Sequence, residues 1–234
     1  MGCIAEIHPK SIGQSAQKPL GIIIPCASYG HVKSYGLRSL LDIKEKPLLS
    51  HQIDTLKAIY PHSEVILGLG FEADKVAQQF AQYRSIENEF HADTSVTRTI
   101  GLALRACLHT SVLIVYGDVL FEPSALSSIT AGGSAVLLDS RGQMRSTNIG
   151  AYITDGSVAR MSYGCPSKFA QVIFITGKEY DLFKAICCDR TKSKLLGFEA
   201  INLVLEQGGH FRGVETEGYI GELSTGADLQ RMRA

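Results

Sequence analysis

The sequence lacks an excess of charge of either sign. Its 234 residues carry 23 Lys and Arg against 23 Asp and Glu, so the formal net charge is zero. A neutral chain has no global basic field to attract polyanions, and we therefore expect neither nucleic acid nor a membrane surface as a partner. Any affinity for anions has to come from local clusters of basic side chains.

Long apolar runs are also missing. The run at residues 112–116 is among the longest, and it is far too short to span a bilayer. Residues 1–18 hold no apolar core of signal-peptide length, and Glu6 stands where a myristoylation signal needs Ser or Thr. We expect a cytoplasmic protein in which residues 1–18 form a flexible polar leader.

Cysteine pairs and several catalytic signatures are absent as well. The six cysteines are scattered, apart from Cys187 and Cys188, and no pair has the spacing of metal ligands, so reduced thiols are expected. The sequence contains no G-x-S-x-G elbow, no H-E-x-x-H motif and no G-x-x-x-x-G-K-[ST] loop. These absences argue against a serine hydrolase of the elbow type, a zinc protease and a P-loop NTPase.

What the sequence does contain is an alternation of strand and helix patterns. Short β-branched runs predict buried strands, and apolar residues at helical spacing predict amphipathic helices. In the first half, the predicted strands are Gly21–Pro25, Glu64–Leu69 and residues 111–116, and the predicted helices are residues 50–59 (with Ser50 as N-cap), 72–83 and 99–108. This alternation predicts a three-layer α/β/α fold with a mostly parallel mixed central sheet.

The second half is less regular. A hairpin is predicted around Asp155 and Gly156, and Ser224 or Thr225 is predicted to cap the last helix. The other predicted strands are residues 134–138 and 171–176, and the helices are residues 179–187, 198–206 and 225–232. Because the chain contains no repeat or clear linker, we expect residues 19–234 to form a single domain.

Residues 19–49 carry the clearest candidate anion site. Glycine lets backbone N–H groups approach a phosphate, and basic side chains neutralise its charge. The small and basic residues after the first strand are Ser28, Gly30, His31, Lys33, Gly36 and Arg38. The alternative is that Arg38 and Lys46 belong to a solvated face, since charges alternate in sign at residues 44–46.

Asp118 ends the predicted strand at residues 111–116. Ligands in such sheets bind at the carboxyl ends of strands, so we expect the loop after Pro25 and Asp118 to share one site. A carboxylate at this point suits a hard divalent cation. The alternative is that Asp118 caps a helix at residues 123–129.

Four separated motifs, in this order, support a more specific interpretation. The first is Lys46-Pro47-Leu48-Leu49, preceded by Leu40-Leu41 and followed by His51-Gln52-Ile53 and Leu56. The others are Gly101-Leu102-Ala103 at a predicted helix start, VLIVYGD ending at Asp118, and ELSTGADL beginning at Glu222. Together they resemble the sugar-phosphate nucleotidyltransferase family, which has a MobA-like, glycosyltransferase-A type fold. The resemblance implies a nucleotide-diphospho-sugar transferase-like architecture.

The match has identifiable departures. Ser28 replaces the first loop glycine of the family, and His31-Val32 replaces its Thr-Arg pair. Lys33 would take the place of the loop arginine, shifted by one residue, and Arg38 replaces the family lysine. Glu222 replaces an aspartate and keeps its charge; without the resemblance it would be read as a first-turn acid favoured by the helix dipole.

The resemblance implies a role for each candidate residue. Arg38 and Lys33 would be catalytic and neutralise phosphate charge, Asp118 and Glu222 would hold Mg²⁺, and Lys168 would meet the acceptor phosphate. The nucleotide would contact Ala27, Ser28, Gly30, Lys46, Gly101 and Gly117, with Gly101 facing the base or ribose. The nucleotide-binding half would span about residues 19–130 and the acceptor-binding half about residues 131–234. Without the resemblance, Gly101 and Lys168 are ordinary structural and surface residues.

The reaction implied is nucleotidyl transfer from an NTP to a small phosphorylated acceptor, with release of pyrophosphate. Short members of the family often use CTP, so CTP is favoured; a homo-oligomer is possible, and the sequence leaves the oligomeric state open. Two alternatives stay open. One is a catalytically weakened relative that only binds nucleotide, suggested by the altered loop around Gly30. The other is a glycosyltransferase that uses a nucleotide sugar, although such enzymes usually carry a D-x-D motif where this chain has a single Asp118.

Overall fold

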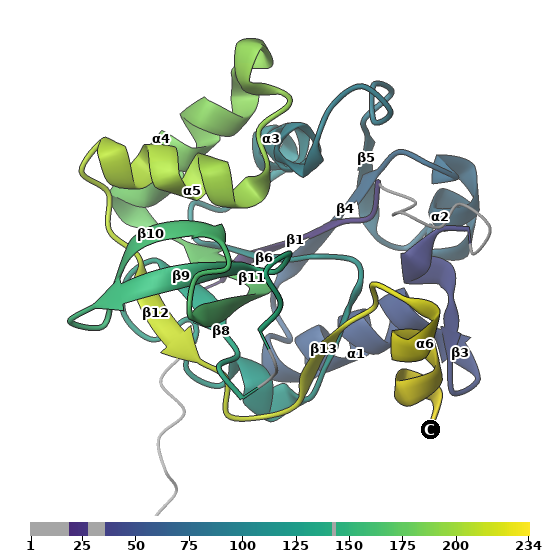
Figure 1. Cartoon of the computed structure of the whole chain (residues 1–234). Coiled ribbons are helices and arrows are strands. Elements are labelled where there is room, and N and C mark those ends of the chain that lie inside the picture. The colour runs from purple at the N-terminus through teal and green to yellow at the C-terminus, as the bar shows by residue number, and fades with distance from the viewer. Residues whose placement is uncertain (1–18, 28–35, 142–143) are drawn as a thin grey trace, which may run out of the picture.

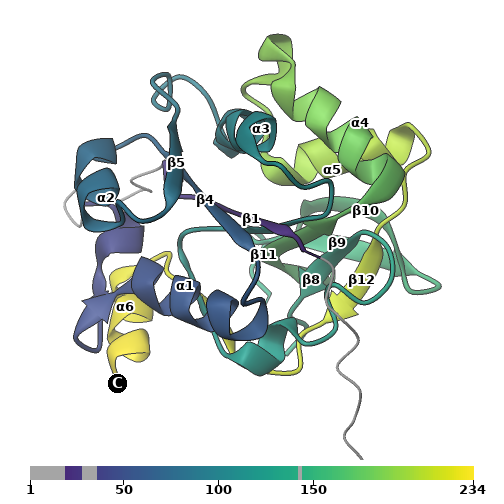
Figure 2. The same cartoon turned by 180° about the vertical axis from the view of Figure 1, so that it is seen from behind.

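The computed structural model describes residues 19–27, 36–141 and 144–234. In this part of the chain, a nine-stranded mixed sheet passes through the centre and helices cover both of its faces (Figure 1, Figure 2). Across the sheet, the strands are β5 (Arg84–Glu87), β4 (Glu64–Leu69), β1 (Gly21–Pro25), β6 (Val112–Val115), β11 (Ser167–Ile175), β8 (Ala135–Leu138), β12 (Arg212–Glu215), β10 (Ser157–Tyr163) and β9 (Ile149–Thr154). The predicted three-layer α/β/α class is confirmed.

The four strands that the first half of the chain contributes to this sheet are parallel. Strand β1 pairs in parallel with β4 and β6, and β4 pairs in parallel with β5. Parallel neighbours need crossover connections, which are the helices α1 (Leu48–Ile59), α2 (Ala73–Gln79) and α3 (Val96–Ala106). The carboxyl ends of β1 and β6 therefore lie side by side at one edge of the sheet.

The second half of the sheet is joined through β11, which runs antiparallel to β6, β8 and β9. Strands β8 and β12 pair in parallel, and the hairpin of β9 and β10 closes this end. The hairpin turn is at Asp155 and Gly156, as predicted, and both residues have positive φ. Helices α4 (Gly177–Cys188) and α5 (Gly197–Glu206) cover one face.

Alternating side chains of β1 divide the core into two layers. Ile22 and Ile24 pack in the layer that includes α1 and α2, whereas Ile23 packs in the layer that includes α3, α4 and α5. All three are fully buried, and each stabilises the fold by about 1.5–3 kcal/mol relative to an exposed side chain. Burial on both faces explains why this strand is a continuous apolar run rather than an alternating one.

Some local predictions are wrong. Helix α1 begins at Leu48, so its N-cap is Pro47 and not Ser50. Helix α3 begins at Val96, five residues before Gly101. The sequence pattern also missed six short strands, namely β2 (Asp42–Ile43), β3 (Lys46–Pro47), β5, β12, β7 (Val119–Phe121) and β13 (Ile220–Glu222).

Strands β7 and β13 form a separate element next to the main sheet. Strands β7 and β13 pair antiparallel, with Glu222 opposite Val119. Helix α6 (Gly226–Arg233) follows β13, and the side chain of Thr225 caps it by accepting a hydrogen bond from the Asp228 N–H. Within the described ranges, no helix has both the length and the apolar character needed to cross a membrane.

Candidate functional site

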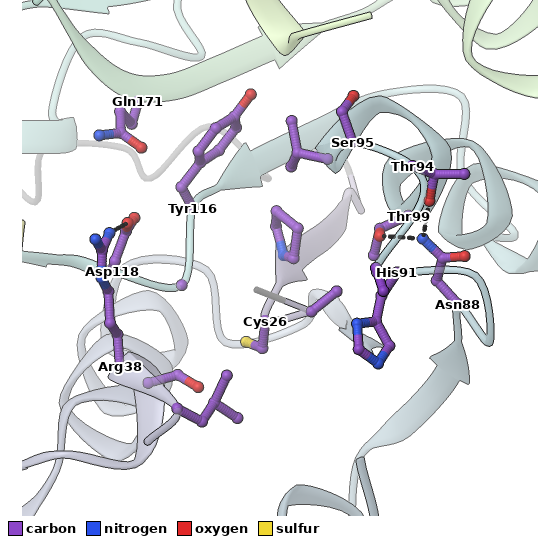
Figure 3. A pocket seen from close by; sticks show the side chains of 17 residues that line it. Cys26, Arg38, Asn88, His91, Thr94, Ser95, Thr99, Tyr116, Asp118 and Gln171 are labelled. Atoms are coloured by element: carbon purple, nitrogen blue, oxygen red, sulfur yellow. Dashed lines mark hydrogen bonds and ion pairs between the residues drawn. The ribbon is translucent and has the colours of Figure 1, made fainter. Parts of the chain in front are cut away.

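A cavity of about 540 Å³ opens at the carboxyl ends of β1 and β6 (Figure 3). Parallel α/β sheets bind ligands at this edge because loops and helix ends converge there. Four of the residues expected in the site, Ala27, Arg38, Gly117 and Asp118, line this cavity together. Gly117 lets the two strand ends approach, since a Cβ atom there would lie 2.9 Å from the Pro25 carbonyl oxygen.

Arg38 and Asp118 form an ion pair in the cavity wall. Arg38 begins a short 3-10 turn, and its Nη1 donates to Oδ2 of Asp118 at 2.7 Å. The two side chains are 16% and 21% exposed, so each remains accessible to a ligand. The alternative role of Asp118 as a helix cap is wrong, because Glu122 occupies the N-cap of the following turn.

Gln52 of α1 fixes the turn that carries Asp118. Its buried Nε2 donates to the carbonyl oxygens of Tyr116 and Val119, both at 2.8 Å. Leaving buried carbonyl groups without partners would cost about 1–3 kcal/mol each, so this amide holds the backbone on both sides of Asp118 in place. In the sequence, Gln52 stands out only as part of a motif, and no local pattern predicts this role.

Glu222 is brought next to Asp118 by the pairing of β13 with β7. The Leu223 N–H donates to the Asp118 carbonyl oxygen at 2.7 Å. The pKa of Asp118 is raised from 3.8 to about 6, first because burial disfavours the charged carboxylate and second because of the negative charge on Glu222, while Arg38 partly offsets both effects. Two carboxylates that repel each other in this way favour a bound cation.

Only these two carboxylates come together at this point, and the described residues contain no group of three or more His, Cys, Asp or Glu side chains able to hold a metal. This donor set fits Mg²⁺, which commonly takes one or two carboxylates from the protein and completes its shell with water and phosphate oxygens.

A second cavity of about 220 Å³ adjoins the first. Its walls include Lys168, whose Nζ lies 4.0 Å from Oε2 of Glu222. Val96, Tyr116 and Gln171 line both cavities and form their shared wall. The candidate acceptor residue and the candidate metal residue are therefore neighbours, although 54 positions separate them in the sequence.

Asn88 lies at the end of the first cavity opposite Asp118 (Figure 3). Its buried amide nitrogen donates to the hydroxyl oxygens of Thr94 at 2.9 Å and Thr99 at 3.1 Å. No local sequence pattern predicts this polar group, because Asn88 follows β5, a short exposed strand with no periodic pattern.

Compared by sequence, the chain matches no protein-family model and no curated protein. Compared by structure, it is similar to the inositol-1-phosphate CTP transferase from T. maritima (TM-score 0.74, 13% identity, 91% of this chain and 94% of that one). It is also similar to the CTP:phosphocholine cytidylyltransferase LicC from Streptococcus pneumoniae (TM-score 0.73, 14% identity, 92% of this chain and 97% of that one). A third similar structure is HddC from Yersinia pseudotuberculosis complexed with GMP-PN (TM-score 0.70, 15% identity, 92% of this chain and 98% of that one).

The chain has the nucleotidyltransferase fold. At these identities the similarity establishes the architecture, and it confirms the expected nucleotide-diphospho-sugar transferase-like fold. The activity has to be argued from the site itself, because one fold hosts many chemistries.

Within this nucleotidyltransferase fold, two expected site residues lie away from the cavity. Gly101 is inside α3 and packs against α4, where a Cβ atom would lie 2.1 Å from the Cys187 carbonyl oxygen. The prediction that it opens a helix and faces a base is therefore wrong; Val96 and Thr99 of the same helix line the cavity instead.

Lys46 forms an exposed ion pair with Asp54 at 2.5 Å. Ser28, Gly30 and Lys33 lie outside the described residues.

The floor of the cavity includes Cys26, which provides no nucleophile. Burial raises the pKa of its thiol to about 12, so it stays protonated at neutral pH. Beside it, the site combines the Arg38 guanidinium, the carboxylates of Asp118 and Glu222 and several polar side chains, an arrangement suited to binding and orienting phosphates.

Proposed function

We propose that the protein is a Mg²⁺-dependent nucleotidyltransferase. It would join the nucleotidyl group of an NTP, with CTP favoured, to a small phosphorylated acceptor and release pyrophosphate. The observation that carries this proposal is the pair of adjoining cavities, with the Arg38–Asp118 pair in the wall of one and the Lys168–Glu222 pair in the wall of the other. Such an arrangement suits two phosphorylated substrates that meet at a shared wall.

The reaction requires positioning and charge neutralisation. An oxygen of the acceptor phosphate attacks the α-phosphorus of the nucleotide, a new P–O bond forms, and the bond to the bridging oxygen of the pyrophosphate breaks with its electron pair. Arg38 uses one of its five N–H donors on Asp118 and has the others for phosphate oxygens. Because it is fixed by an ion pair, the guanidinium stabilises charge in the transition state with little reorganisation.

Asp118 and Glu222 are the residues that would hold Mg²⁺. The bound cation would neutralise charge on the phosphate oxygens of the nucleotide. In this chain, the repulsion between the two carboxylates is the feature that favours a cation, since it is what raises the pKa of Asp118 after burial.

Lys168 would bind the acceptor phosphate. Its side chain is 24% exposed and lines the smaller cavity beside apolar side chains such as Ile149, Phe169 and Phe198. The volume of about 220 Å³ favours a small acceptor. The favoured nucleotide, CTP, is supported by the sequence resemblance and by the names of two structurally similar proteins, which describe CTP transferases.

The test is pyrophosphate release from each of the four NTPs with Mg²⁺ and a panel of sugar phosphates and phosphorylated alcohols. We expect one pair to give turnover and Asp118→Ala to lower kcat/KM by about 10³-fold, the order expected when a key charge-stabilising group is lost. Asp181→Ala, which changes an exposed residue of α4, is the matched control and should retain activity. Absence of release with every pair would refute the proposal.

Two other outcomes identify the alternatives. Thermal stabilisation by an NTP with Mg²⁺, without any pyrophosphate release, would indicate a relative that only binds nucleotide. Transfer from a nucleotide sugar without pyrophosphate release would indicate a glycosyltransferase.

A further inference from the structure

Gln171 has a backbone conformation that side chains rarely adopt. Its φ is 61°, in the left-handed region, although it lies in the middle of strand β11. The other described non-glycine residues with positive φ are in turns or next to a helix end, and are Lys44, Glu45, Glu72 and Asp155. A glutamine in this region is strained by contact between its Cβ and the backbone, whereas glycine is not.

A bulge in β11 creates this conformation. Phe169 pairs with Leu138 and Ile173 pairs with Val136, so four positions of β11 span two positions of β8. At the bulge, the Gln171 carbonyl oxygen turns to accept the Tyr116 N–H at 3.2 Å. The backbone therefore needs the left-handed region at this position, and a glycine would satisfy the same hydrogen bond without strain. Strain of this kind, beside a site, points to a role for the side chain.

The Gln171 side chain projects into the site. It lies on the same side of the first cavity as Tyr116 and Asp118 (Figure 3), and it also lines the second cavity. Within the described ranges, its carboxamide makes no hydrogen bond to the protein, so both its N–H and its C=O groups are available to a ligand.

We propose that Gln171 positions the acceptor, by donating a carboxamide N–H to the acceptor phosphate at the junction of the two cavities. This inference rests on the proposed nucleotidyl transfer. Lys168 lies three positions earlier on β11 and lines the same second cavity, which assigns Gln171 to the acceptor rather than to the nucleotide. A neutral N–H donor orients the acceptor phosphate beside the Lys168 ammonium group. A second cation in its place would withdraw more negative charge from the attacking oxygen.

The strain and the role are tested with Gln171→Gly and Gln171→Ala. Both variants remove the carboxamide, but only glycine relieves the left-handed backbone, so the glycine variant should unfold at a temperature about 2–4 °C higher than the alanine variant. Both should raise the acceptor KM by about tenfold or more and leave the NTP KM within about twofold.

Gln171→Glu separates a binding role from a packing role. Glutamate keeps the shape of glutamine but replaces the donor with a negative charge, so the acceptor KM should rise further than in the alanine variant. Gln82→Glu is the matched control, because Gln82 is exposed between α2 and β5, and its kinetics should match those of the wild type. An unchanged acceptor KM in the alanine and glutamate variants, or an effect confined to the NTP KM, would overturn the proposal.

A binding measurement keeps this proposal separate from the proposed function. If the wild type releases no pyrophosphate with any pair, nucleotidyl transfer fails, and the shift in unfolding temperature produced by inorganic phosphate decides the role of Gln171. A smaller shift in Gln171→Glu than in the wild type supports phosphate binding by Gln171, and equal shifts overturn it.

Discussion

Replacing Asp118 with asparagine is expected to stabilise the metal-free protein while abolishing the proposed activity. The pKa of Asp118 is raised from 3.8 to about 6 in the folded chain, so the fold disfavours its charged form. Asparagine resembles the protonated carboxyl group and can still accept a hydrogen bond from Arg38. The change therefore removes an unfavourable charge without removing a hydrogen-bond partner.

The magnitude follows from the pKa. A rise of about two pKa units, at about 1.4 kcal/mol each, makes the charged carboxylate cost about 3 kcal/mol of unfolding free energy. This is an upper limit, because the side chain is 21% exposed and water partly solvates it. For a domain of this size, the gain corresponds to an unfolding temperature about 6–12 °C higher.

The sign of the pH dependence is fixed by the direction of the shift. Since the folded-state pKa lies above the unfolded value, the stability associated with this proton is complete below pH 3.8 and is lost as the pH rises through about 6. The advantage of the asparagine variant should therefore approach about 3 kcal/mol near pH 8 and fall to about 1 kcal/mol near pH 4.5.

The assay is urea denaturation of both proteins at these two pH values in the presence of a chelator. Asp181→Asn, at an exposed position of α4, is the control and should change the unfolding free energy by less than about 0.5 kcal/mol. If Asp118→Asn destabilises the protein near pH 8, or if its effect is the same at both pH values, the account of Asp118 as a carboxylate held at an unfavourable site is wrong.

Two further predictions concern glycines that permit close contacts. Gly101→Ala should destabilise the fold by about 3 kcal/mol or more, measured by thermal unfolding, because its Cβ would lie 2.1 Å from the Cys187 backbone oxygen and the two helices have to separate; a neutral effect would show that α3 and α4 are packed less closely. Gly197→Ala would place a Cβ 1.9 Å from the Tyr116 hydroxyl oxygen, so it should displace that ring and destabilise the fold. Adding Tyr116→Phe should restore part of the lost stability, and a double variant no more stable than Gly197→Ala would contradict this contact.

Short polar strands account for many of the features that the sequence does not predict. Strand β5 has the sequence RSIE and β12 has RGVE, and neither shows an apolar run or an alternating pattern that would distinguish a strand from a loop. They become strands because a neighbour offers unpaired backbone groups, β4 for β5 and β8 for β12. The failure to find Asn88 follows directly, since its position is set by the end of β5.

The sequence by itself determined the buried strands and the residue at the end of one of them. Apolar β-branched runs such as Gly21–Pro25 have to be buried on both faces, so they predict a covered sheet, and a carboxylate following such a run lies at the edge where ligands bind. For this reason, the fold class and the location of Asp118 at the cavity followed from local patterns.

Only the tertiary structure decided which distant residues meet. Glu222 lies beside Asp118 because β13 pairs with β7. Lys168 lies beside Glu222 because β11, a strand of the central sheet, contacts β13. The left-handed backbone of Gln171 likewise arises because β11 pairs with β6 in a continuous register but with β8 in a register that shifts. No pattern within the strand specifies this difference. Pairing between strands is a property of the assembled sheet, and the geometry of the site depends on it.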